Sequence, residues 1–598
     1  MNIAIAQMRS TPGAFDQTRT RMLDFASRAQ AQGARLVVFP AFAISGGCPI
    51  DEADQEGFIT DMLACLQAFA DEAPIDCLIP VVGEIDGMPL YEAVLVRDRT
   101  AHALRMESEF EALRRTLHGD EAGDGSGSFL SFEFEGMRFA LAFTSEDLDA
   151  IGETGHAFDA VLFASTYSFA HDSAFTQLCS SLTETRYPSD AERMGAWLIA
   201  VGSLGVFDTQ VFSGGSFVLA PWGELAAEAP SFEEALITYP IDPSSEGPLA
   251  QPLTPDVPDR LLMLMNALIF GLAGFCQAEG VRDVALVMDG SLISSAIAAL
   301  ACDALGPMHV HACVGGAASA ELDAAARDLA ARLRIDVTLA PEGSSLDQVE
   351  LMRAELVRGS GALALINLDK TGFCLENRAG VLSVGGLAPL ADVYRSDVLA
   401  LARMRNTISP VISPASIRAW SVPPIEGISQ RYLTPESALE FVDYVLSGRL
   451  EWGRTYTQIV EEDCGDELAG RVLECLRIRR MARLAAPRTL IVSSRSLMES
   501  PQSFGLRWHD SLRDRSDQGL EQITGYLHAR TAAQGRSSGE DYQQELKDTL
   551  SFLRDLATSG ELFAGLAHEE APEDASREEP RPDPADDSWT LGNPFSVN

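Results

Sequence analysis

Short apolar runs alternate with longer helical segments through most of the chain, and this alternation limits its fold more than any other feature. Within the first 240 residues many short runs are apolar on both faces, as expected for strands in sheets that are covered on both sides. The expected strands are Asn2–Gln7, Arg35–Phe39, Cys77–Glu84, Ser131–Phe143, Ala160–Ala164, Trp197–Gly202 and Ser216–Ala220, and the expected helices are Phe15–Gln32 and Gln55–Phe69. The pattern predicts a layered α/β domain over residues 1–240.

A proline-rich stretch without periodicity, Pro240–Pro258, separates this domain from a second α/β unit. We place the linker at 241–258 and the second domain at 259–500. Its expected strands are Val284–Met288, His309–Val314, Asp336–Ala340 and Ala362–Asn367, and its expected helices are Leu261–Glu279, Ser294–Leu305, Ala318–Leu333 and Leu346–Val357. This rhythm predicts a doubly wound parallel sheet whose ligand site lies beyond the carboxyl ends of the strands.

The end of the chain differs in composition from both α/β domains. Residues 501–565 are polar with a helical pattern, as in Asp541–Leu556, and predict a helical extension. Residues 566–598 form an acidic, proline-rich tail that we predict to be disordered. Its less charged end, Trp589–Phe595, is either a docking peptide or an inert terminus, and we favour the inert terminus.

Charge and cysteine usage narrow the possible partners. The formal net charge is −42, from 87 acidic and 45 basic residues, which disfavours nucleic acids and anionic membranes. The N-terminus is an alternating strand rather than a signal peptide, and we expect no membrane-spanning run of about eighteen apolar residues. The ten cysteines are scattered without a C-x-x-C pair, which predicts neither a zinc site nor a disulfide framework. A cytoplasmic location fits best.

Two segments of the first domain resemble the nitrilase superfamily but carry different reactive residues. Residues 36–46 read LVVFPAFAISG and residues 141–148 read LAFTSEDL. The family segments run L-V-V-F-P-E-x-x-x-x-G and L-x-x-C-E-D-L. By this resemblance, Ala41 stands in place of the glutamate base and Ser145 in place of the cysteine nucleophile. Arg114 takes the place of the family lysine, and a planar guanidinium differs from an ammonium in size and donor geometry.

The substitutions in the first domain argue against amidase chemistry. An alanine cannot accept a proton, and a serine without a base is a weak nucleophile. Ser145 is either a small polar residue at a strand end, which we favour, or the nucleophile of a serine hydrolase, for which this segment supplies no base. The segment FSGGSF (212–217) resembles the family's F-D-G-G-S-F, with Ser213 replacing the acid.

The second domain contains a similarly altered phosphate loop. Residues 289–294 read DGSLIS, after an expected strand and at the start of an expected helix. They resemble the NAD synthetase loop S-G-G-I-D-S, whose backbone N–H groups close on phosphate. The loop positions are Asp289, Gly290, Ser291 and Ser294, and only Gly290 and Ser294 match the family. Asp289 replaces the leading serine and Ile293 replaces the family aspartate. The added carboxylate is expected to repel a phosphate.

Other positions of the implied ATP site are partly retained. Residues 366–372 (INLDKTG) resemble T-T-G-N-K-S-E, so Lys370 is kept and Gly372 replaces a metal-binding glutamate. Residues 389–395 (PLADVYR) resemble P-L-K-D-V-Y-K, with Arg395 in place of the second lysine. Lys370, Arg395 and Arg479 are either residual ligand contacts or charges on the surface and at helix caps, and the sequence leaves both interpretations open.

Taken in order, the two halves resemble glutamine-dependent NAD synthetase over about residues 1–500. The resemblance implies an α/β fold: an N-terminal nitrilase-like α-β-β-α sandwich followed by a doubly wound parallel-sheet, NAD synthetase-like (adenine nucleotide hydrolase-like) domain. In that family the first half releases ammonia from glutamine, and the second uses ATP to amidate nicotinic acid adenine dinucleotide. ATP and magnesium are expected as cofactors only if the synthetase site is active, and we predict no other metal.

The altered motifs predict a catalytically silent relative that acts as a scaffold or regulatory partner. Two alternatives stay open: an active NAD synthetase supplied with glutamine or ammonia, and a sensor that binds a nucleotide without turning it over. The resemblance also implies a homo-oligomer, with an active NAD synthetase paralogue as a further candidate partner. We predict no nucleic-acid and no membrane partner.

Overall fold

The computed structural model describes most of the chain up to residue 497. The described residues are 1–47, 56–85, 88–106, 129–155, 157–173, 186–255, 259–376, 386–464, 467–479 and 487–497. The segment Met1–His509 forms one compact unit. Arg114, the predicted helical extension 501–565 and the predicted tail 566–598 lie outside the described residues.

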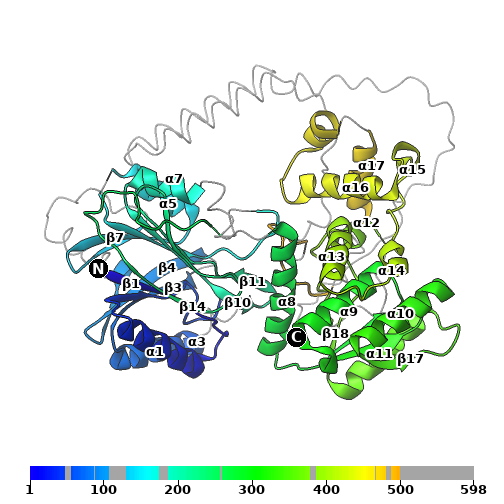
Figure 1. Ribbon diagram of the computed structural model, residues 1–598, viewed down its shortest axis with the longest axis horizontal. Helices are drawn as coiled ribbons and strands as arrows, with labels where there is room; N and C mark the ends of the chain where they lie inside the picture. Colours follow the sequence, from blue (N-terminus) through cyan, green and yellow to red (C-terminus); the bar gives the residue numbers. More distant parts are fainter. Residues whose placement is uncertain are drawn as a thin grey trace, which may run out of the picture. The chain divides into compact units, whose positions relative to one another are not determined.

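The first half begins with a six-stranded sheet in the order β14-β1-β2-β3-β4-β5. Its strands are β1 (Asn2–Gln7), β2 (Leu36–Val38), β3 (Asp76–Ile85), β4 (Met88–Arg97), β5 (Thr100–Ala103) and β14 (Ala235–Pro240). Helices α1 (Phe15–Ala31) and α3 (Glu56–Glu72) cover its outer face (Figure 1). Along β1, Ile3 and Ile5 face the second sheet while Ala4 and Ala6 face these helices, so both faces are buried.

A second six-stranded sheet, in the order β13-β12-β9-β8-β7-β6, packs against the first. Its strands are β6 (Leu130–Phe134), β7 (Met137–Ala142), β8 (Ala160–Ser165), β9 (Trp197–Gly202), β12 (Phe217–Leu219) and β13 (Leu225–Glu228). Helices α5 (Ser145–Glu153) and α7 (Arg186–Met194) cover its far face. The predicted α-β-β-α sandwich is confirmed.

The prediction of one long strand at Ser131–Phe143 is wrong, because this segment forms the β6–β7 hairpin. The chain reverses at Glu135 and Gly136, whose φ angles are 48° and 80°. Two consecutive residues with positive φ are the requirement of a tight two-residue hairpin turn. Glutamate is an uncommon residue for the first of these positions, and the turn was missed for that reason. A second hairpin, β10 (Leu204–Phe207) and β11 (Gln210–Ser213), was also not predicted.

The second half opens with helix α8 (Arg260–Ala278), which corrects one expectation. By length and composition this helix could cross a membrane, whereas no such run was expected. In the structure, residues on several sides of α8 pack in a core shared with strand β15 (Val284–Met288) and helix α9 (Leu292–Leu305). Gly271 and Gly274 bring α8 close to Val211 and Val206 of the β10–β11 hairpin. A helix packed by protein on several sides is apolar nearly all round.

A four-stranded parallel sheet in the order β17-β16-β15-β18 forms the centre of the second half. The other strands are β16 (Val310–Val314), β17 (Asp336–Leu339) and β18 (Leu363–Ala364), and the further helices beside the sheet are α10 (Ala320–Leu333) and α11 (Leu346–Ser360). Leu286 faces the core with α9, while Val287 faces α11 on the opposite side. The predicted doubly wound parallel sheet is confirmed.

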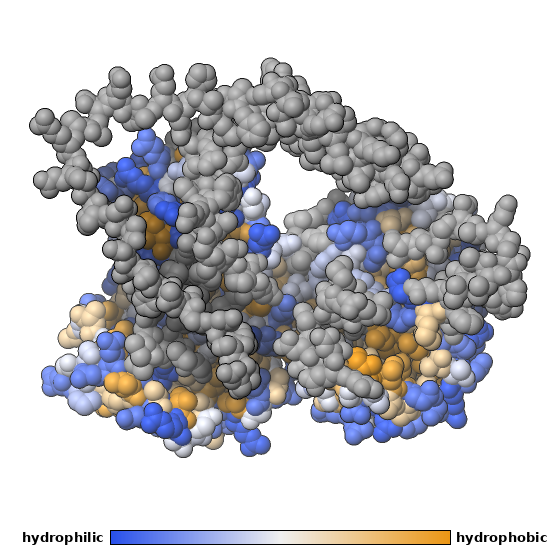
Figure 2. Space-filling view, turned by 180° about the vertical axis from the view of Figure 1, so that it is seen from behind, coloured by the Kyte–Doolittle hydropathy of each residue, from blue (hydrophilic) through white to orange (hydrophobic). Residues whose placement is uncertain are grey.

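A group of helices completes the described chain. Its elements are α12 (Lys370–Leu375), α13 (Arg395–Ile408), α14 (Pro414–Arg418), α15 (Ile428–Arg431), α16 (Pro435–Leu450), a π-helical turn (Gln458–Cys464) and α17 (Glu467–Ile478). Val442, Val445 and Leu446 of α16 pack with Val472 of α17 in a separate apolar cluster. Hydrophilic residues cover much of the described surface in Figure 2, in keeping with the high net charge.

Candidate functional site

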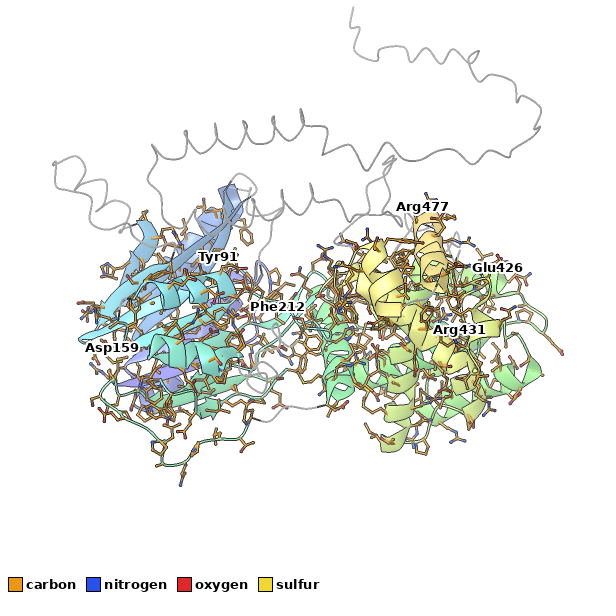
Figure 3. The ribbon with its side chains drawn as sticks, turned by 90° about the horizontal axis from the view of Figure 1, so that it is seen from above. Tyr91, Asp159, Phe212, Glu426, Arg431 and Arg477 are labelled. Atoms are coloured by element: carbon orange, nitrogen blue, oxygen red, sulfur yellow. The ribbon has the colours of Figure 1, made fainter. Side chains whose placement is uncertain are left out.

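Ala41, the position of the implied glutamate base, lies in an apolar cluster just after β2. It is 0% exposed and lies between the two sheets with Phe42, Phe207 and Phe212. The ring of Phe42 packs edge-on against Phe207 and Phe212, with centroid distances of 5.8 and 5.4 Å. Phe212 lies at the side of the first half next to the α8 helix (Figure 3). These rings offer no donor that could stabilise a carboxylate.

Ser145 is the first residue of α5, and the residues around it start that helix. Thr144 Oγ1 accepts a hydrogen bond from Asp147 N (3.3 Å), and Asp147 Oδ2 accepts one from Thr144 N (3.0 Å). This reciprocal pair is a capping box. Thr144 and Asp147 of the TSED segment therefore have a structural role, because they cap the start of the helix.

The hydroxyl of Tyr167 contacts Ser145 twice. Ser145 N donates to Tyr167 Oη (2.9 Å), and Ser145 Oγ lies 3.0 Å from the same oxygen. In acyl-transfer enzymes an N–H at such a helix start stabilises the developing oxyanion. Here that donor is already bonded to a phenol. Sequence reasoning missed Tyr167, although β7 and β8 pair in parallel and residues beyond their ends must meet.

The groups that touch Ser145 do not activate it. Ser145 Oγ donates to Glu146 Oε2 at 3.2 Å. The Glu146 backbone N–H, together with the Ser145 and Thr144 hydroxyls, lowers the pKa of the Glu146 carboxyl, which makes it a poor proton acceptor at neutral pH. Among the described residues no histidine or lysine hydrogen-bonds to Ser145. The place of Arg114 stays a prediction, since residues 107–128 are not described.

The SGGS loop that follows β11 is held by Gln7 of β1. Gln7 Oε1 accepts from Ser216 N (2.9 Å) and Ser216 Oγ (2.8 Å). Gly214 has φ +71°, and a Cβ there would lie 2.6 Å from Gln7 Cδ. Glycine is therefore required at 214 by both backbone conformation and close approach. The loop that contains Ser213, at the implied amidase site, is therefore tightly packed against Gln7.

In the second half, the loop before α9 is closed by its own side chains. Asp289 Oδ1 accepts hydrogen bonds from Ser291 N (2.9 Å) and Ser294 Oγ (2.6 Å). Ser291 Oγ accepts from Ser294 N (3.3 Å) and caps the helix. These backbone donors are of the kind that bind phosphate at a helix N-terminus. The Asp289 carboxylate thus occupies an anion position made by the loop itself.

Packing against the same loop leaves little room for a ligand. Leu292 N donates to Ala419 O (3.1 Å), so a further helix donor is bonded within the protein. Gly290 has φ +79°, and a Cβ there would lie 2.1 Å from Leu322 O of α10. Ile293, where the family has an aspartate, is 4% exposed and belongs to the core.

Lys370 is fully buried and bonded to protein groups on every side. Its Nζ donates to Asp392 Oδ1 (2.9 Å), Ser493 Oγ (2.7 Å) and Arg495 O (3.0 Å), and it lies 2.5 Å from Glu451 Oε1. Burial alone would lower the pKa of Lys370, but the Asp392 and Glu451 carboxylates raise it above its ordinary value. The interpretation of Lys370 as a surface or cap charge is therefore wrong: it is 0% exposed inside an ionic network.

Arg395 forms a second buried ionic group beside α12. Its Nε donates to Asp369 Oδ2 (2.8 Å) and its Nη1 to Glu376 Oε1 (2.7 Å). It is 2% exposed, so it too is neither a surface nor a cap charge. A Cβ at Gly372, where the family has a metal-binding glutamate, would lie 2.9 Å from Arg395 Nη2. The guanidinium thus fills the space that a side chain at 372 would need.

Asp443 of α16 joins these helices from the opposite side. Its Oδ1 accepts from Thr371 Oγ1 (2.6 Å) and its Oδ2 from Ser396 N (2.9 Å). Burial raises the pKa of Asp443 to about 7 despite these donors. The sequence offered no sign of Asp443, because it lies outside every motif and meets Thr371 only through the packing of α16.

The structure thus places the predicted positions of the second half in three groups: the start of α9, the network around Lys370 and the network around Arg395. Asp289, Gly290, Ser291 and Ser294 meet at the start of α9, whereas Lys370 and Arg395 lie in the buried ionic networks. Among the described residues no hydrogen bond or ion pair joins either cation to the α9 loop. ATP and magnesium do not fit these residues, because Asp289 occupies the loop donors and both cations are neutralised by carboxylates.

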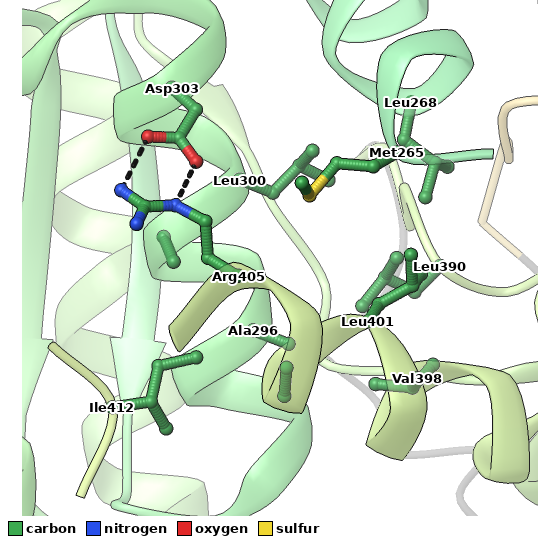
Figure 4. A pocket seen from close by; sticks show the side chains of 12 residues that line it. Met265, Leu268, Ala296, Leu300, Asp303, Leu390, Val398, Leu401, Arg405 and Ile412 are labelled. Atoms are coloured by element: carbon green, nitrogen blue, oxygen red, sulfur yellow. Dashed lines mark hydrogen bonds and ion pairs between the residues drawn. The ribbon is translucent and has the colours of Figure 1, made fainter. Parts of the chain in front are cut away.

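A small cavity between α8, α9 and α13 is no substitute for a nucleotide site. Its volume is about 30 Å³, and its wall is apolar apart from the Asp303–Arg405 ion pair (Figure 4). Ligand pockets of drug-sized molecules span roughly 300–1,000 Å³. The cavity has space for a methyl group or two.

The chain is similar to known proteins along most of its length. The carbon-nitrogen hydrolase family matches residues 2–118. The glutamine-dependent NAD(+) synthetase of Rhodobacter capsulatus is 25% identical over 558 residues, which cover 85% of this chain and 99% of the relative. The enzyme of the same name from Xanthomonas campestris pv. campestris (strain 8004) is 25% identical over 536 residues, which cover 81% of this chain and 94% of the relative. The chain therefore has glutamine-dependent NAD synthetases among its homologues, as the sequence motifs predicted.

Solved structures share the fold. The glutamine-dependent NAD+ synthetase of Acinetobacter baumannii, determined in complex with ADP, aligns with a TM-score of 0.55 at 19% identity, covering 84% of this chain and 97% of that one. The glutamine-dependent NAD(+) synthetase of Cytophaga hutchinsonii aligns with a TM-score of 0.62 at 13% identity, covering 85% and 97%. At these identities the likeness extends to the fold and no further.

Proposed function

We propose that this protein is a relative of the glutamine-dependent NAD synthetases in which both half-reactions are silent, and that it acts by binding, as a scaffold or regulatory partner. The observation that carries the proposal is the Asp289 carboxylate bonded to Ser291 N and Ser294 Oγ. A polyphosphate needs these donors and positive charge around it. At this loop it would meet a negative charge and donors that are already bonded.

The first half supports the same proposal by different means. Ala41 is buried in the apolar cluster that contains Phe42, Phe207 and Phe212, and the backbone N–H of Ser145 is bonded to Tyr167 Oη. Among the described residues, neither an effective base bonded to Ser145 nor a free N–H at its position is left for hydrolysis of glutamine. We expect no ammonia release from glutamine above a heat-killed control. Turnover that disappears in Ser145→Ala would instead show that the serine is active.

The synthetase half is tested with free ammonia, which bypasses the first half. NAD formation is measured from nicotinic acid adenine dinucleotide, ATP, magnesium and ammonia, and ATP binding is measured by calorimetry on the same sample. We expect neither product nor binding. Product formation would contradict the proposal and make the protein an active synthetase. Binding without product would favour a nucleotide sensor.

One variant tests whether Asp289 blocks an otherwise intact ATP site or whether no ATP site is left. In Asp289→Ser the family residue returns and the competing carboxylate is gone. If the carboxylate is the main obstacle, ATP binding appears in this variant and not in Asp283→Ser, a matched aspartate change just before β15.

For assembly, we propose a homo-oligomer, at least a dimer, with an active NAD synthetase paralogue as a second candidate partner. Light scattering that shows a folded monomer at micromolar concentration would contradict the homo-oligomer.

A further inference from the structure

The segment Arg488–Ser496, here called the strap, runs between the two halves and bonds to both. It forms one parallel β-bridge to Gln210 of β11, through Ile491, and another to Leu387 in the second half, through Arg488. On the side of the first half its further bonds are Ile491 N to Thr209 O (2.8 Å), His171 N to Val492 O (2.8 Å) and Ser494 N to Asp172 Oδ1 (2.8 Å).

The strap is bonded at least as firmly to the second half. Asp392 Oδ2 accepts from Val492 N (2.9 Å) and Ser493 N (2.8 Å), and Ala388 N donates to Arg488 O (2.7 Å). Lys370 adds its bonds to Ser493 Oγ and Arg495 O. The retained lysine and aspartate therefore serve to hold the strap, a role that requires no nucleotide.

Packing places the middle of the strap in the interior. Leu490 and Val492 are 0% exposed and belong to the core that contains α8 and β15. A Cβ on Gly271 of α8 would lie 2.9 Å from Val211 and 3.2 Å from Leu490, so helix, hairpin and strap meet without spare space. The strap cannot move toward one half without breaking bonds to the other and opening this contact.

The ring of His171, in the first half, contacts Arg260 at the start of α8. Arg260 Nη1 lies 3.0 Å from His171 Nδ1, and because a guanidinium has only donors, this nitrogen accepts. Arg260 in turn is paired with Asp397 of α13. The loop that carries His171 and Asp172 is thus tied to α8, to α13 and to the strap.

We propose that the strap mechanically couples the two halves, so that a change at the Lys370–Asp392 anchor is transmitted to the β10–β11 hairpin, and a change at Asp172 to the 386–393 segment. Coupling of this kind needs a contiguous element that both sides bias, and the strap is bonded to both sides along its length. The proposal holds whether or not either half turns over a substrate, so it can fail independently of the proposed function.

Hydrogen–deuterium exchange on the full chain tests the first direction. Asp172→Ala removes the two hydrogen bonds from Ser494, and Asp172 makes no hydrogen bond with the described residues 386–393. We expect amides in 386–393 to exchange at least about tenfold faster, because local opening at the strap exposes them. Asp159→Ala is the matched control: Asp159 also accepts from a backbone N–H, that of Arg138 (2.7 Å), but does not bond to the strap. Faster exchange confined to residues 169–173 and the strap would overturn the proposal.

Ser493→Ala tests the reverse direction and serves if Asp172→Ala does not fold. This change removes hydroxyl bonds to Lys370 and Asp392 only, while the backbone bonds of residue 493 remain. We expect faster exchange in the hairpin 204–213, which Ser493 does not touch. A folded Ser493→Ala chain whose hairpin exchanges within about twofold of the wild-type rate would refute coupling through the strap.

Discussion

The start of α5 in the first half and the start of α9 in the second half are filled in contrasting ways. At α5 a neutral phenol from another strand end bonds to Ser145 N, and Ala41 of the same half is buried in an apolar cluster with Phe42, Phe207 and Phe212. At α9 a carboxylate within the loop bonds to the loop, and charged networks lie buried beside α12. In our proposal, packing and the phenol leave no room for a ligand in the first region, and charge opposes one in the second. The two regions should therefore respond differently to substitution and to pH.

The largest effect is expected from breaking the charged region at Lys370. Lys370→Met leaves Asp392 and Glu451 buried without their shared cation, which we expect to lower the free energy of unfolding by about 3–5 kcal/mol. Urea unfolding followed by circular dichroism measures the change. Arg332→Met, which removes an exposed ion pair with Asp328, is the control and should cost no more than about 1 kcal/mol. Similar losses in both variants would mean that burial of the network matters little.

The next effect is a pH dependence that only the charged region should show. The pKa of Asp443 is about 7 in the folded protein, above its ordinary 3.8, so the folded state binds this proton more tightly. Stability from this group is fully present below about pH 4 and is lost as the pH rises through 7. Between pH 4.5 and 7.5 we expect the wild type to lose on the order of 3 kcal/mol of its free energy of unfolding through this group. Asp443→Asn cannot titrate and should not show this loss.

Urea unfolding of wild type and variant across this pH range provides the test for Asp443. Asp24→Asn, an aspartate whose side chain is 63% exposed and paired with an arginine, is the control and should run parallel to the wild type. Parallel curves for Asp443→Asn would show that this carboxyl titrates normally in the folded protein.

The apolar region should be sensitive to charge at Ala41. Ala41→Glu places a carboxylate among phenylalanines, and we expect it to lower the free energy of unfolding by about 2 kcal/mol or more at pH 8. Part of this loss should return at pH 5, where a buried carboxyl binds a proton. Ala41→Gln has the same shape without the charge, so its loss should be equal at both pH values. Thermal melts at pH 5 and pH 8 distinguish the two.

The smallest effect is expected at the cavity between α8, α9 and α13, where apolar packing is incomplete. Ala299 lines the cavity of Figure 4, whereas the adjacent Ala298 is fully packed in the core. We expect Ala299→Val to raise the free energy of unfolding by up to about 1 kcal/mol by filling the cavity. Ala298→Val should instead cost about 1–3 kcal/mol through overpacking. Equal losses at both positions would show that the cavity is not available to a methyl group.

The sequence predicted those features that depend on local pattern. Strands such as β1 and β15 were found because their residues are apolar in short runs. The carboxylate of the α9 loop was recognised because Asp289 lies inside the loop to which it bonds, and its effect on a phosphate stays a prediction. Tyr167 and Asp443 were missed, since each reaches its partner only after sheets or helices have packed. The ionic network of Lys370 could not be predicted for the same reason, because the sequence around this lysine gives no sign of four partners from three distant stretches of chain.

The burial of Lys370 also makes it a chemical reporter. The chain contains only two lysines, Lys370 and Lys547. With Lys370 0% exposed, an amine-reactive reagent can modify it only when the ionic network opens. The labelled fraction of the single peptide that carries Lys370, read by mass spectrometry over time, would therefore count opening events at the junction of the two halves in the unmodified wild-type chain.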